Sequence, residues 1–197
     1  MKRIIYSLLL LLPLQAFATA CFQGEAYYYR PTSSTLRDIY GQAWCGGKLV
    51  GEGSLSETKW YLQRIYLFGE VGYLANDGET LVGGYSTKIR IVPLTIGVKW
   101  MQPINEAFYA YLGAGPRYFF MRIKDSLSVV NPRTTKNGCG GVVIVGSKYY
   151  LTKPFYIDTF LSYDFKRFSA PKTPAGITGH SLEVGGLQIG GGLGLSF

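Results

Sequence analysis

Hydrophobic and polar positions alternate most regularly at the end of the chain. Within the segment 181–197, every second position from Leu187 to Phe197 is apolar or glycine, and the positions between hold glycine, glutamine or serine. The apolar row includes Leu187, Ile189, Leu193, Leu195 and Phe197. Because successive side chains of a β-strand point to opposite faces, the pattern predicts a strand with one apolar face and one small, polar face.

Seven earlier segments also have the composition and pattern of strands, although the two faces of 39–55 are poorly marked. Polar connections separate the segments, with longer ones after the odd-numbered strands, at 31–38, 76–79, 125–138 and 170–180, and short ones after the even-numbered strands. This layout predicts eight antiparallel strands. The predicted strands are residues 22–30, 39–55, 59–75, 85–101, 107–124, 139–152, 155–168 and 181–197.

Two prolines, Pro93 and Pro116, fall inside predicted strands. Proline has no backbone N–H and therefore removes one hydrogen bond from the ladder between strands. We expect a bulge or a strand end at both positions.

Periodicity alone does not decide which face of the predicted sheet is outside. A soluble lipocalin-like barrel also has eight strands and would place its apolar face inside. The alternate faces carry too many charges for a dry soluble core, which favours an all-β, eight-stranded, antiparallel up-and-down transmembrane β-barrel. The charges predicted to line its lumen are Arg64, Glu70, Lys99, Arg117, Asp158, Asp164 and Lys166. An interior of this width has room only for its own side chains, so we expect an ion-paired, closed lumen rather than a conducting pore.

The N-terminal segment has the features of an export signal. Lys2 and Arg3 precede the apolar run 4–14, and Ala18-Thr19-Ala20 resembles a cleavage site. The run is too short for the roughly 20 residues of a membrane-spanning helix. Residues 1–20 are thus predicted to be a cleaved signal peptide and residues 21–197 a single barrel domain. Cys21 would then begin the mature chain and is a candidate for lipidation, although Ala18 stands where a lipoprotein signal usually has leucine.

Composition supports an exported, β-rich chain. Gly (26), Tyr (16) and Phe (11) are abundant, and charged residues make up only 16%. Of 20 Lys and Arg, two belong to the signal, which leaves 18 against 12 acidic residues. This excess of basic residues would favour binding to lipopolysaccharide phosphates, or it belongs to basic barrel rims, and the scattered positions of the basic residues argue against nucleic acid as a partner.

The three cysteines, Cys21, Cys45 and Cys139, have no deducible pairing, and their odd number leaves one for a lipid, a disulfide-linked partner or a free thiol.

Three stretches resemble the small eight-stranded outer-membrane β-barrel superfamily, the OmpW-like, OmpX-like and OmpA-barrel proteins. They are Val92-Pro93-Leu94-Thr95-Ile96-Gly97-Val98, the segment 108–115, and the closing segment 190–197. The resemblance implies the outer membrane of a Gram-negative-type bacterium, and it implies that Phe197 is the signal read by the outer-membrane assembly machinery. It implies no single activity, because the same barrel serves anchors, adhesins, small pores and lipid-modifying enzymes.

Candidate chemistry is sparse. His180 and Ser181, with Glu183 nearby, have the residue types of a lipid A deacylase site, but the deacylase spacing of one intervening residue is absent. No metal or cofactor motif occurs in the sequence.

We therefore expect a non-enzymatic protein with a structural or surface role, or one that passes small apolar molecules. A lipid-modifying enzyme and a barrel tethered through Cys21 are the alternatives. Basic residues at the loops that could meet lipopolysaccharide phosphates, a host surface or a partner are Lys124, Arg133, Lys136 and Lys172.

Overall fold

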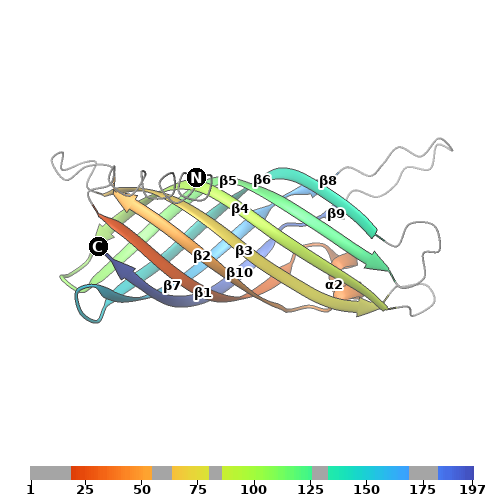
Figure 1. Cartoon of the computed structure of the whole chain (residues 1–197), viewed down its shortest axis with the longest axis horizontal. Helices are drawn as coiled ribbons and strands as arrows, with labels where there is room; N and C mark the ends of the chain where they lie inside the picture. Colours follow the sequence, from red (N-terminus) through yellow and green to blue (C-terminus); the bar gives the residue numbers. More distant parts are fainter. Residues whose placement is uncertain (1–18, 55–63, 80–85, 126–132, 169–181) are drawn as a thin grey trace, which may run out of the picture.

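The computed structural model describes residues 19–54, 64–79, 86–125, 133–168 and 182–197. Eight strands close into an antiparallel up-and-down barrel, which confirms the predicted fold class (Figure 1). The strands are β1 (Ala20–Pro31), β2 (Trp44–Ser54), β3 (Ile65–Glu79), β4 (Ser86–Pro103), β5 (Phe108–Asp125), β6 (Arg133–Tyr150), β7 (Phe155–Phe165) and β10 (Gly186–Ser196).

The last strand closes the barrel against the first. β10 pairs with β1 from Cys21 opposite Ser196 to Pro31 opposite Gly186, and β7 lies on its other side. The backbone of Ala20 exchanges two hydrogen bonds with Phe197, of 3.2 and 2.8 Å. Each of the eight barrel strands pairs with a neighbour on both sides, so the ladder closes on itself. We call the end with Phe197 the turn end and the opposite end, which carries the short helix, the loop end.

The apolar face of the strands is outside. β7 alternates exposed and buried positions along its whole length, with Phe155, Leu161 and Tyr163 exposed and Asp158 and Asp164 buried. Other exposed side chains around the wall are Ile96, Val98, Leu112, Val143, Leu187, Ile189 and Leu193. An apolar band with a charged interior is the reverse of a soluble barrel and is typical of a barrel whose wall faces lipid.

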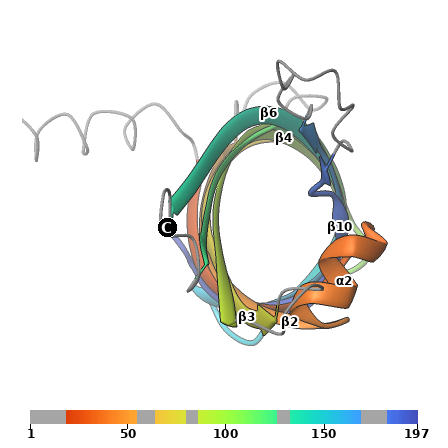
Figure 2. The ribbon, with the colours of Figure 1, turned by 90° about the vertical axis from the view of Figure 1, so that its right-hand side faces the viewer.

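A short helix was missed in the sequence. The segment 39–55 was expected to be one strand after a polar loop, but residues Ser34–Tyr40 form helix α2, and β2 begins only at Trp44. Ser33 caps the helix by accepting a hydrogen bond from the N–H of Leu36. The helix forms because Leu36 and Tyr40 bury their side chains at the loop end, where Figure 2 shows α2 at the rim. Within the described residues, no helix has the length and apolarity needed to cross a membrane.

The wall formed by β3 to β6 extends further at the loop end than predicted. The expected turn at 76–79 is part of β3, because pairing with β4 continues to Glu79 opposite Ser86. The expected loop 125–138 is likewise shortened, since β6 begins at Arg133 and pairs with β5 from there. The prediction of long and short connections also fails once, because the gap between β2 and β3 is longer than the gap between β3 and β4. Ladder hydrogen bonds outweigh the turn preference of the polar residues in these segments.

The two segments predicted to be strands seven and eight are interrupted near the loop end. β7 stops at Phe165, and Arg167–Phe168 forms a separate strand, β8, that pairs with β9 (Leu182–Glu183). Between β9 and β10, Val184 turns inward and is buried, and its carbonyl accepts a 2.9 Å hydrogen bond from the Tyr29 hydroxyl. This small two-stranded sheet stands apart from the barrel ladder.

Neither interior proline ends a strand or causes a bulge, so that expectation was wrong. The β3–β4 register is the same on both sides of Pro93, from Val71 opposite Leu94 to Leu74 opposite Ile91, with only the intervening pairs missing. The β4–β5 ladder likewise resumes in register across Pro116. On its other side, Pro116 stays paired with Gly141 of β6. A closed barrel holds each strand from two sides, so the loss of one hydrogen bond does not displace it.

Candidate functional site

The interior holds a chain of ion pairs that we call the arginine cluster: Glu25, Lys48, Glu70, Arg117 and Asp164, from five different strands. All five are buried. Arg117 of β5 reaches across the lumen, and its guanidinium contacts the carboxylates of both Glu70 and Asp164. Lys48 lies 2.9 Å from Glu25 and 3.4 Å from Glu70, which joins the two halves of the cluster.

Neutral side chains complete the arginine cluster. The Nε of Arg117 donates a 2.7 Å hydrogen bond to the Thr95 hydroxyl, which itself donates to Glu70 at 3.1 Å. Gln188 of the closing strand donates a 2.6 Å hydrogen bond to Asp164. The guanidinium is fully buried, so its ion pairs are stronger than they would be in water. They offset the free energy that the group loses when it leaves water.

A second group, the lysine cluster, consists of Glu52, Lys99 and Lys148. Lys99 lies 2.8 Å from Glu52, and Lys148 contacts the other carboxylate oxygen of the same residue. Nearby, Asp158 accepts a 2.7 Å hydrogen bond from the Tyr111 hydroxyl. One carboxylate thus serves two ammonium groups in this part of the lumen.

Aromatic rings cover the three buried lysines. The ammonium of Lys48 is 3.6 Å from the ring centroid of Phe160, that of Lys99 is 4.6 Å from Tyr111, and that of Lys148 is 4.5 Å from Tyr156. The face of an aromatic ring attracts a cation, most strongly where water is excluded. These rings fill the lumen and compensate part of the desolvation of the lysines.

An apolar plug closes the loop end above the ionic clusters. Trp44 packs against Tyr29 and Tyr40, with ring centroids 5.5 and 5.8 Å apart. The Tyr40 hydroxyl is 3.0 Å from the hydroxyl of Thr87 on β4, which ties α2 to that strand. The plug residues, all buried, are Tyr29, Leu36, Tyr40, Trp44, Ile89 and Met121.

The structure places the predicted lumen charges in two groups. Glu70, Lys99, Arg117, Asp158 and Asp164 are buried in the interior. Two others lie outside the clusters and are only half-buried. Arg64 donates a 2.8 Å hydrogen bond to Gln102 near the turn end. Lys166 follows the end of β7 and donates to the carbonyl of Cys139 at 2.7 Å.

Four interior charges were missed in the sequence: Glu25, Lys48, Glu52 and Lys148. Lys48 and Glu52 belong to the segment whose two faces were poorly marked. On the face that carries Leu49, the positions two residues before and after it are glycines, so no apolar row identified the outer face. Lys148 shares its row with the apolar Val142 and Ile144, which concealed it. The sequence did hold one signal: Lys48 and Glu52 are four residues apart, so a strand places both side chains on the same face.

Two features near β1 concern the closing strand and the cysteines. In the closing strand, the space beside Gly194 is taken by the ring of Tyr156. The Tyr156 hydroxyl donates a 2.8 Å hydrogen bond to Gln23. Cys21 is buried, at 1% exposure, whereas Cys45 and Cys139 are exposed, and all three thiols are free.

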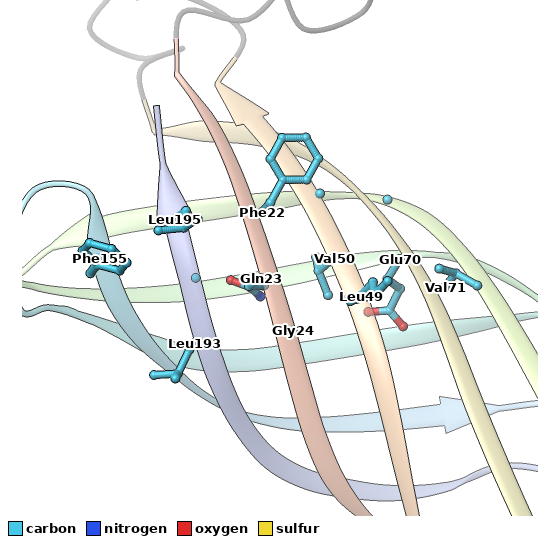
Figure 3. Close-up of a pocket in the computed structure, with 13 residues that line it drawn as sticks. Phe22, Gln23, Gly24, Leu49, Val50, Glu70, Val71, Phe155, Leu193 and Leu195 are labelled. Carbon is cyan, nitrogen blue, oxygen red and sulfur yellow. The ribbon is translucent and has the colours of Figure 1, made fainter. Parts of the chain in front are cut away.

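A hollow of about 830 Å³ lies on the outer wall over β10, β1, β2 and β3, rather than in the lumen (Figure 3). Its rim carries the exposed apolar side chains of Phe22, Leu49 and Leu193. Gln23 and Glu70 border it, but their polar groups bond to interior partners. The hollow thus has an apolar surface of the kind that lipid chains contact and offers no catalytic group.

The candidate deacylase residues His180 and Ser181 lie outside the described residues, so that hypothesis stays untested by the geometry. Glu183 is exposed in β9, opposite Arg167. Within the described parts of the chain, no group of three or more His, Cys, Asp or Glu side chains is arranged to hold a metal ion.

Comparisons with known proteins agree with the fold. No family model and no curated protein matches the sequence. The chain is similar to OprG of Pseudomonas aeruginosa, with a TM-score of 0.66, 14% identity, and coverage of 92% of this chain and 97% of that one. It is also similar to Neisserial surface protein A, with a TM-score of 0.58, 14% identity, and coverage of 90% of this chain and 97% of that one. A third similar structure is Ail of Yersinia pestis, crystallised with the heparin analogue sucrose octasulfate. Its TM-score is 0.54 at 14% identity, and the match covers 91% of this chain and 97% of that one. The chain therefore has the fold of small eight-stranded outer-membrane barrels, as its sequence motifs predicted.

Proposed function

We propose that the protein is a non-enzymatic barrel of the bacterial outer membrane, with a structural or surface role and a lumen closed to ions. An apolar wall and a closed ladder suit a lipid environment. By the usual layout of such barrels, the turn end faces the periplasm and the loop end faces the exterior. Delivery would use the cleaved signal 1–20, and assembly would use Phe197.

The observation that carries this proposal is the placement of Arg117. Its side chain is fully buried and lies across the lumen between carboxylates of β3 and β7. An ion on the barrel axis would have to displace this ion pair and then the apolar plug, each of which is costly to desolvate or unpack. The same charges oppose the passage of small apolar molecules along the axis.

Reconstitution into a planar bilayer tests the closed lumen. We expect folded protein, verified by heat-modifiable gel migration, to give no stable conductance steps. Large and stable single-channel steps from the same preparation would overturn the proposal.

The cysteines provide a second, independent test. A variant with Cys45→Ser and Cys139→Ser leaves Cys21, at 1% exposure, as the reporter of the interior. A water-soluble maleimide is expected to leave Cys21 unmodified in the folded barrel and to modify it fully in urea. The matched positive control adds Glu106→Cys to a variant with all three native cysteines replaced by serine, because Glu106 is exposed in the turn between β4 and β5, outside the lipid-facing wall. Rapid modification of Cys21 in the folded protein would indicate a water-accessible lumen.

The alternative of a lipid-modifying enzyme predicts altered lipid A in cells that express the protein. We expect the lipid A mass spectrum of such cells to equal that of control cells. The loss of an acyl chain, abolished by Ser181→Ala, would replace the structural role with deacylation.

A further inference from the structure

Two arginines face each other on the outer wall near the loop end. Arg90 of β4 and Arg122 of β5 are directly opposite in the ladder, and both are exposed. Two positions further toward the loop end, Lys88 and Lys124 are opposite each other in the same way. In antiparallel pairs the Cβ atoms of opposite residues are about 5 Å apart, so these charges share one small surface. We call these four residues the basic patch.

The surroundings of the basic patch leave the arginines without an acidic partner. The residues across from them on the outer strands are Ala75 of β3 and Thr135 of β6. Among the described residues, neither guanidinium has an ion pair or hydrogen bond. The nearest acids lie closer to the loop end. Asp77 is two residues after Ala75 and lies 2.8 Å from Lys88, and Glu79 is two residues further and is opposite Ser86.

The position of the patch along the wall corresponds to a lipid headgroup. Arg122 follows Phe120 by two residues, about 7 Å along the strand. Tyr73, Tyr118 and Phe120 are exposed on the wall just before it, and the rings of Tyr118 and Phe120 are 4.9 Å apart. Aromatic side chains of this kind mark the interface between the apolar core and the headgroups, so the arginines stand at headgroup level.

Like charges directly opposite each other destabilise a sheet unless an anion lies between them. A phosphate monoester carries up to two negative charges and several acceptor oxygens, and the arginine fork suits it. A carboxylate or a phosphodiester brings only one charge to the two arginines, which together carry two positive charges. The geometry therefore favours a ligand with phosphate monoesters on a lipid headgroup.

We propose that Arg90 and Arg122, flanked by Lys88 and Lys124, bind a phosphate of lipopolysaccharide in the outer leaflet. The proposal rests on the membrane orientation given above but not on the closed lumen, so either one can fail alone. Lipid A carries such phosphates at the membrane surface, and its acyl chains would lie along the apolar wall below the patch.

The test measures binding of bisphosphorylated lipid A to the purified barrel in zwitterionic detergent, for the wild type and for Arg90→Gln/Arg122→Gln. Each lost arginine contact is expected to weaken binding about tenfold, since hydrogen bonds to charged groups are the strong ones. Arg30→Gln is the matched control, because Arg30 is also exposed at the loop end but lies on β1, opposite Leu187. It is expected to bind as the wild type does.

Three further ligands identify what the patch binds. Dephosphorylated lipid A and phosphatidylglycerol are expected to bind the wild type at least tenfold more weakly than the bisphosphorylated form. Millimolar inorganic phosphate is expected not to compete, because it lacks the chains that contact the wall. Equal affinity of the double variant and the wild type would overturn the proposal. So would equal binding of the dephosphorylated lipid, equal binding of phosphatidylglycerol, or full competition by free phosphate.

Discussion

The interior and the outer rim hold basic side chains in opposite ways. Inside, each of Lys48, Lys99, Arg117 and Lys148 contacts at least one carboxylate. On the rim, Arg90 faces Arg122 with no acid in the same row. The same β4–β5 ladder therefore carries paired charges on one face and opposed like charges on the other.

The difference follows from the solvent on each face. A buried charge that lacks a partner costs several kcal/mol, so the interior is tolerable only when every cation is matched. At the rim, water and mobile ions screen the repulsion, and two arginines can remain opposite each other at small cost. Pairing inside is a requirement for folding, whereas like charges outside leave the surface free to bind an anion.

Removing the interior guanidinium should have the largest effect. Arg117→Met leaves Glu70 and Asp164 buried without their shared cation and should lower the free energy of unfolding by about 3–5 kcal/mol. Urea titration followed by heat-modifiable gel migration measures the change. The triple variant Glu70→Gln/Arg117→Met/Asp164→Asn removes the uncompensated charges and should recover most of the loss. If the triple variant is less stable than Arg117→Met, pairing is not the reason for the effect.

The lysine cluster should tolerate a loss better. Lys148→Met leaves Glu52 with Lys99 at 2.8 Å, so we expect a decrease of about 2 kcal/mol in the free energy of unfolding, the value of one charged hydrogen bond. The same urea titration applies, and Lys99→Met provides the matched comparison. A decrease in the free energy of unfolding as large as that of Arg117→Met would contradict the expectation that the remaining Lys99–Glu52 pair keeps the cluster stable.

The exposed pair Asp77–Lys88 should contribute far less than either interior cluster. The Lys88 side chain is 40% exposed and that of Asp77 71% exposed, so Asp77→Asn should cost less than about 1 kcal/mol. Unfolding in 50 mM and in 1 M salt distinguishes the two regions, because salt should remove this small effect and leave that of Arg117→Met unchanged. A salt-independent loss would contradict the contrast between rim and interior.

The opposed arginines should give the smallest effect, of opposite sign. In zwitterionic detergent without phosphate, Arg122→Gln relieves the repulsion from Arg90 and should raise the free energy of unfolding by a few tenths of a kcal/mol. With bisphosphorylated lipid A present, the same substitution should lower it, because the wild type alone then gains the full binding energy. Arg30→Gln should change stability in neither condition. Destabilisation by Arg122→Gln without any lipid would mean that the arginine is structural.

Much of the barrel was predictable from the sequence because its information is local. The period of two in segments such as 155–165 assigns each side chain to one face, and eight such segments account for a closed wall. The same count placed Glu70, Arg117 and Asp164 on one face. Strand ends were predicted less well, as at 76–79, because turn-forming residues there are held in the ladder by pairing with β4.

The tertiary structure decided which charges meet and where the lumen is closed. Arg117 is 47 residues from each of its two carboxylate partners, and the strands that carry them are not its neighbours in the barrel. Helix α2 is only seven residues long, and although Leu36, Ile39 and Tyr40 have helical spacing, so short a helix depends on the burial of Leu36 and Tyr40 beside Trp44 for its stability. A strand pattern determines a face, but only closure of the barrel brings side chains of distant strands within contact distance across the lumen.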